Sequence, residues 1–110
     1  MANTFDRKTQ RAVGTTRQQI ESYVVAASTQ TTVIGLSVAN ITASPITVTV
    51  EHYDGVNYTH IVKDAPVPVG GSLVVVGGDQ KLVLSTGDSM YVTSSAASSA
   101  DVMMSILEIT

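Results

Sequence analysis

Residues 46–62 read ITVTVEHYDGVNYTHIV, and they carry the clearest indication of fold class in the chain. In its first half, apolar residues alternate with Thr and Glu, which is the period-two pattern of a strand with one buried face. Asp54 and Gly55 follow, and an Asp-Gly pair tolerates the positive φ angles of a two-residue type I′ turn. The sequence therefore predicts an antiparallel hairpin built from strands 46–53 and 56–62.

Outward from this hairpin, short β-type runs alternate with turn residues about every 8–12 positions, a rhythm typical of sandwiches and small barrels. The other runs expected to form strands are 31–39, 73–76, 81–84, 90–93 and 102–109, with a weaker run at 22–27. Because all four residues from Leu73 to Val76 are apolar, we expect that strand to be buried on both faces. No stretch repeats at helical spacing. The prediction is an all-β fold, a single sandwich of seven or eight short antiparallel strands with jelly-roll-like connections.

Composition supports this class and limits the possible functions. Val, Ile and Thr make up 38 of the 110 residues, and these β-branched side chains suit a pleated surface. The length fits one domain and leaves no room for a second, catalytic one. The absence of Cys excludes a disulfide scaffold. Only 14% of residues are charged, which indicates a surface partly covered by other subunits.

Charge is unevenly distributed along the chain. Residues 1–20 hold four basic residues and one acidic residue, whereas residues 21–110 hold two basic and eight acidic ones. We expect residues 1–20 to be an irregular, extended basic arm attached to a sandwich domain of residues 21–110, with a solvated tail as the alternative. The arm residues expected to contact a neighbouring copy are Phe5, Arg7, Lys8, Arg11 and Arg17. Four cations and one aromatic residue are too few to indicate nucleic-acid binding.

Residues that carry chemistry are scarce. The predicted two-residue turn sets His60 opposite Thr49, which places His52 and His60 on opposite faces of the hairpin, where they cannot share a metal. The glycine pairs at 70–71 and 77–78 lack the spacing, the lysine and the helix of a phosphate-binding loop. We therefore expect no enzyme activity, no catalytic residue, no metal and no cofactor. No apolar run has the length of a signal peptide or a membrane span, so we expect no membrane association.

Three stretches resemble small virion structural proteins of tailed bacteriophages. They read APVPVGGSLVVVGGDQKLVL at 65–84, STGDSMYVTSS at 85–95 and ADVMMSILEIT at 100–110. In that family, a turn-and-strand unit with a Gly-Asp pair precedes a terminal strand that ends in a Leu-Glu-Ile type sequence. The resemblance implies a sandwich subunit in many copies, made in the host cytoplasm and located in the virion, without cofactor or catalysis.

Several roles follow from this resemblance. The chain is expected to be a head–tail or neck component, a capsid-decorating protein or a tail accessory protein. Its partners are then copies of itself and other virion proteins of the capsid, portal, neck or tail. The alternative is a receptor- or carbohydrate-binding module of a virion, although such sites usually expose aromatic platforms and this chain has four tyrosines and one phenylalanine.

Overall fold

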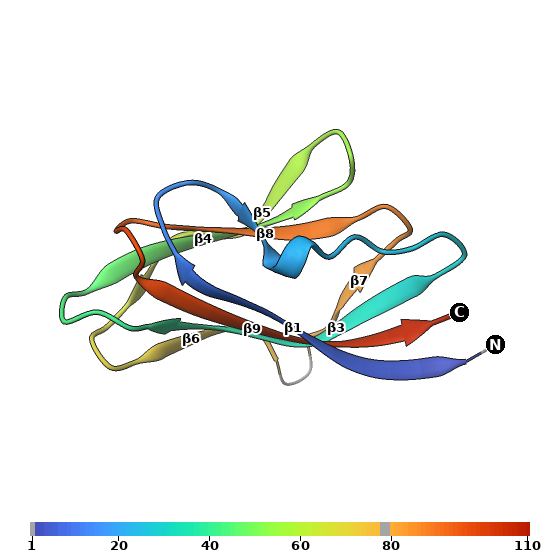
Figure 1. Ribbon diagram of the computed structural model, residues 1–110, viewed down its shortest axis with the longest axis horizontal. Coiled ribbons are helices and arrows are strands. Elements are labelled where there is room, and N and C mark those ends of the chain that lie inside the picture. The colour runs from blue at the N-terminus through green and yellow to red at the C-terminus, as the bar shows by residue number, and fades with distance from the viewer. Residues whose placement is uncertain (1, 78–79) are drawn as a thin grey trace.

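The computed structural model describes residues 2–77 and 80–110, and these residues form two packed antiparallel sheets (Figure 1). A short 3₁₀ turn, η1 (Ile20–Ser22), is the one helical element in this part of the chain. The strands are β1 (Asn3–Val13), β2 (Gln18–Gln19), β3 (Gln30–Asn40), β4 (Ile46–Tyr53), β5 (Tyr58–Val67), β6 (Ser72–Val76), β7 (Leu82–Leu84), β8 (Ser89–Ser94) and β9 (Ala100–Ile109).

The connectivity is that of a jelly roll. One sheet has the order β1-β9-β3-β6, with β7 also paired to β3, and the other has the order β2-β8-β4-β5. The pairs are nested: β1 with β9, β2 with β8, β3 with β6 and β7, and β4 with β5. Such nesting is what results when one long hairpin rolls up into two sheets. The predicted all-β sandwich with jelly-roll-like connections is confirmed.

The core lies between the two sheets and is made of the side chains that point inward, which are about every second residue of each strand. Val33 and Ile106 face it from the first sheet, and Val50 and Val92 face it from the second. Each is fully buried, as expected where two half-apolar sheets pack face to face. The alternation in the sequence therefore identifies the buried face of β4 correctly.

The predicted hairpin forms as β4 and β5, but its turn differs from the prediction. Tyr53 pairs with Tyr58, so the turn has four residues rather than two. The Asp54 carboxylate accepts hydrogen bonds from the main-chain N–H groups of Val56 and Asn57, at 2.9 and 2.7 Å. The Asp54 N–H itself donates to the Asn57 carbonyl oxygen at 3.2 Å. The Asp54 side chain thus takes the N–H groups of Val56 and Asn57, because a local Asp side chain competes with the main chain for its donors.

The N-terminal segment is also different from the expectation. Residues 3–13 are not irregular: they form β1, which pairs with β9 along almost its whole length (Figure 1). Val13 and Ile20 are fully buried in the core, so residues of the segment 1–20 belong to the sandwich. The prediction of an irregular arm is wrong because β1 is held by main-chain hydrogen bonds to β9, and such bonds leave no apolar pattern in the sequence.

Three smaller expectations need correction. The structure has nine strands among the described residues instead of seven or eight, since β1 and β2 come from the segment expected to be irregular. β6 is not buried on both faces, because the outer face of its sheet is uncovered and Val74 is 66% exposed there. Most of the weak run 22–27 is loop. Gly78, in the second glycine pair, lies outside the described residues.

Candidate assembly surface

The outer face of the five-stranded sheet carries the N-terminal residues expected to contact neighbouring copies. In the register of β1 with β9, Phe5 lies opposite Leu107. Four residues further on, Thr9 lies opposite Met103, which is exposed, whereas the next residue, Met104, is buried. Because side chains alternate between faces, Phe5 and Met103 point away from the core.

Large apolar side chains gather on this outer face. Those exposed on it are Phe5, Val74, Val83 and Met103, at 73%, 66%, 64% and 52% exposure. They come from β1, β6, β7 and β9, so the folded sheet is needed to bring them together. Val74 and Val83 share the face of Met103, because they pair with the residues of β3 that point outward. Exposed apolar patches are candidate interaction sites, so this outer face is the candidate assembly surface.

Two shallow hollows lie between these side chains. One, of about 400 Å³, is bounded by Phe5, Arg7, Ile34 and Ser105. The other, of about 420 Å³, is lined by Thr9, Arg11, Ser37, Ala39, Asp101 and Met103. Small outward residues line both hollows, namely Ser105 in the first and Ser37 and Ala39 in the second.

Charge borders the same face. Arg7 and Arg11 rise from β1, and within residues 2–77 and 80–110 neither has a carboxylate within 4 Å. Asp101 lines the second hollow and accepts a hydrogen bond from the Ala12 N–H at 2.9 Å. Among the described residues, the face therefore presents two cations without a carboxylate partner, Arg7 and Arg11. Beside Arg11 lies Asp101, whose carboxylate accepts a main-chain hydrogen bond.

Lys8, another of the expected arm residues, is used inside the molecule. Its ammonium group lies 3.3 Å from Asp6 and 3.6 Å from Glu21, and 5.1 Å from the centre of the Tyr23 ring. These contacts join β1 to the 3₁₀ turn η1. The structure therefore separates Lys8 from Phe5, Arg7 and Arg11.

Arg17 lies in the loop before β2 and contacts the opposite sheet. Its guanidinium makes two hydrogen bonds to the Glu51 carboxylate, at 3.0 and 3.2 Å, and stacks 3.8 Å from the centre of the Tyr58 ring. The hydrogen bond to Glu51 raises the pKa of Arg17. Of the five residues expected to form one assembly site, three lie on the outer face of the five-stranded sheet and two make internal ion pairs.

A tyrosine cluster that the sequence analysis did not identify lies beside Arg17. Tyr53 and Tyr58 stack with ring centres 4.4 Å apart, and Tyr91 meets them edge-on at 5.7 and 5.3 Å. The two-residue turn predicted for the hairpin pairs Tyr53 with Val56, so the cluster was hidden by the wrong register. A four-residue turn over Asp54 to Asn57 brings the two rings together.

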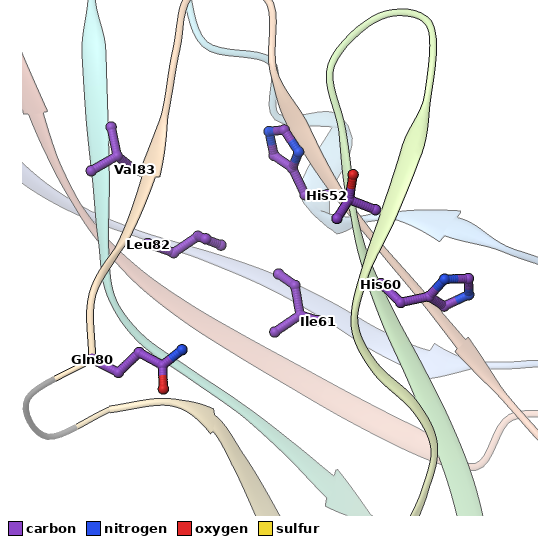
Figure 2. A pocket seen from close by; sticks show the side chains of 7 residues that line it. His52, His60, Ile61, Gln80, Leu82 and Val83 are labelled. Carbon is purple, nitrogen blue, oxygen red and sulfur yellow. The ribbon is translucent and has the colours of Figure 1, made fainter.

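The histidines lie on opposite faces of the hairpin, as predicted, although His60 pairs with Glu51 rather than with Thr49. His52 Nε2 is 2.7 Å from Asp88 Oδ2, and the same oxygen accepts the Ser85 N–H. Asp88 therefore ties the turn before β8 to β4. A hollow of about 340 Å³ lies beside β7, and His52, His60 and Leu82 are among the residues that line it. Figure 2 shows that the His60 ring points away from Leu82.

No group of three or more His, Cys, Asp or Glu side chains in the described ranges is arranged to hold a metal ion. In the same ranges no helix has the length and apolar character needed to span a bilayer.

The comparisons with known proteins show a shared fold. No protein-family model matches the sequence, and no curated protein matches it. A chain from the acid-stable capsid of Helicobacter pylori bacteriophage KHP30 aligns over 100% of this chain and 94% of its own, with a TM-score of 0.57 and 7% identity. A chain from the disulfide-linked pili of Bacillus endospore appendages aligns over 98% and 88%, with a TM-score of 0.54 and 18% identity. Both are structural proteins, and this chain has their fold.

Proposed function

We propose that this chain is a non-enzymatic structural subunit of a bacteriophage virion. In this proposal it assembles with copies of itself and with other virion proteins, and its place is the neck, the capsid surface or the tail. The single observation that carries the proposal is the outer face of the five-stranded sheet, with Phe5 and Met103 exposed beside two hollows.

The fold supports the same proposal. Jelly rolls are a recurrent architecture of viral capsid proteins, and the similarity to the KHP30 capsid chain spans the whole length of this one. Fold alone does not define function, so the argument rests on the surface. On that surface, β1 supplies Phe5, Arg7 and Arg11. We therefore propose an assembly role for these three residues, although the strand that carries them is paired with β9.

Self-association tests the surface directly. The double variant Phe5→Ser/Met103→Ser should sediment as a smaller species than the wild type at equal concentration, with association weakened by about tenfold or more. Val56→Ser is the matched control, because Val56 is 80% exposed but lies at the tip of the β4–β5 hairpin. Equal sedimentation of the wild type and the double variant, or a wild type that is monomeric at all concentrations, would contradict the proposal.

Incorporation into particles tests the virion role. In an infected host, the wild type should co-purify with particles and the double variant should be depleted from them, while Val56→Ser should incorporate normally. Labelled protein seen by electron microscopy at the neck, capsid surface or tail would then assign the position.

A receptor- or carbohydrate-binding role is a second candidate, and the tyrosine cluster is the observation that favours it. Against it, Tyr58 has its ring between Tyr53 and the Arg17 guanidinium, so neither face of that ring is open to a sugar. Binding of the wild type to a glycan array, lost in Tyr91→Ala and kept in Phe5→Ser/Met103→Ser, would support this second role.

A further inference from the structure

The free edge of β1 has a definite hydrogen-bonding pattern. Ala2 and Thr110 exchange both main-chain hydrogen bonds, at 3.2 and 3.0 Å. The register continues without a shift as far as Gln10, and in an antiparallel pair bonded and non-bonded residues alternate. The even-numbered residues therefore bond to β9, and the N–H groups of the odd-numbered residues from Asn3 to Thr9 point away from the sheet.

Two carboxylates cover the middle of this edge. The Arg7 N–H donates to Asp6 Oδ1 at 2.8 Å, and the Thr9 N–H donates to Glu21 Oε1 at 3.0 Å. Lys8 bridges both carboxylates. The same N–H groups are the main cause of the lowered pKa of Asp6 and of Glu21, so both carboxylates stay charged at neutral pH.

We propose that Asp6 and Glu21 guard a strand-addition site on β1, and that the occupant of this site is the β1 strand of a second copy. An unpaired strand edge is a template for another strand, and folded proteins commonly block such edges with charge. Here the block is specific, because each carboxylate occupies a main-chain donor that the added strand would need. The identity of the occupant, a second copy of this chain, rests on the self-assembly proposed above.

The sequence of β1 favours its own antiparallel pairing. A two-fold axis through Arg7 sets Asp6 opposite Lys8 of the other copy, and Lys8 opposite its Asp6. Opposite charges directly across a strand pair stabilise it. The two Arg7 side chains meet at the axis and oppose the pairing, and salt screens this repulsion together with the two Asp6–Lys8 attractions. In this register the Thr9 N–H is a required donor, and Glu21 is the group that occupies it.

Removing the guard tests the proposal. Glu21→Ala frees the Thr9 N–H and should tighten self-association about tenfold in sedimentation, the effect of one or two added main-chain hydrogen bonds per pair. Glu21→Gln is the matched control, because it removes the same charge but keeps an oxygen that can accept the Thr9 N–H. In hydrogen exchange, the Thr9 amide of Glu21→Ala should be labile in dilute solution and protected on concentration.

A second-site variant shows whether the edge itself is the contact. Thr9→Pro removes an outward N–H that is not used by β9, which an edge strand tolerates. Added to Glu21→Ala, it should return association to the wild-type level. Three results would each contradict the proposal that Glu21 blocks strand addition. They are unchanged association of Glu21→Ala, an equal increase in Glu21→Gln, and an increase that persists when Thr9→Pro is added.

The edge and the outer face are separable in these experiments. Glu21→Ala should tighten association in the Phe5→Ser/Met103→Ser background as well, because the edge contact does not need that face. Failure of the face variants alone contradicts the proposed function. Failure of the Glu21 series alone contradicts the guard.

Discussion

Arg17 and Glu51 lie 34 positions apart in the chain, and Arg17 Nε lies 3.0 Å from Glu51 Oε1. Only 3% of the Glu51 side chain is exposed, whereas 44% of the Arg17 side chain is. The pair attaches the loop before β2 to the middle of β4. A carboxylate this deeply buried depends on its partner, because an uncompensated buried charge is strongly unfavourable.

The first prediction concerns this pair. Arg17→Leu should lower the midpoint of thermal unfolding more than the double variant Arg17→Leu/Glu51→Leu does, because the single change leaves Glu51 buried without its cation. Differential scanning calorimetry at neutral pH measures both. A double variant less stable than Arg17→Leu would show that His60, 3.6 Å from Glu51, or water replaces the cation.

The second prediction concerns the N-terminal segment. Ile20→Ala should cost about 2–5 kcal/mol of unfolding free energy, the usual range for a large apolar side chain removed from a core. Ile41→Ala is the matched control, because Ile41 is half exposed, and it should change stability by less than about 0.5 kcal/mol. Urea unfolding followed by circular dichroism compares them. Equal effects would mean that residues 1–20 do not contribute to the core.

The third prediction concerns the hairpin turn. Gly55 has φ +98°, and nothing lies within 4 Å of an added Cβ, so a side chain there meets strain but no clash. Gly55→Val should destabilise the protein by about 1–3 kcal/mol. Gly55→Asn should cost less, because Asn adopts positive φ more readily than a β-branched residue. Similar melting temperatures for the two variants would contradict the role of backbone strain.

The fourth prediction concerns pH. Burial raises the pKa of Tyr23 to about 12, and its hydroxyl donates to Glu108 at 2.9 Å. The folded state therefore favours the neutral phenol, and its contribution to stability is complete below about pH 10 and is lost as pH rises toward 12. Absorbance at 295 nm should show one tyrosine titrating above the usual range. That late step should be absent in Tyr23→Phe and retained in Tyr91→Phe.

Local sequence pattern was enough for the architecture of the sandwich and for part of the hairpin. The alternation from Ile46 onward identifies the buried face of β4, because a strand has a period of two whatever it pairs with. The prediction that His52 and His60 lie on opposite faces of the hairpin is also correct, although the predicted register is wrong. A turn of four residues shifts the pairing by two positions, and a shift by two leaves each side chain on the same face.

An all-β sandwich is predictable from sequence alone, since β-branched alternation and regular turn residues act over a few positions and need no distant partner. The place of residues 1–20 in the sandwich, in contrast, depends on contacts that are distant in the chain. β1 is attached through main-chain hydrogen bonds to β9, about a hundred positions away, and every residue type except proline can make them. Long-range pairing of β2 with β8, and of β8 with β4, likewise placed Arg17 on Glu51, and the fold set Lys8 between Asp6 and Glu21. It also gathered Phe5, Val74, Val83 and Met103 on one face, because the sheet order that sets these neighbours is a property of the whole chain.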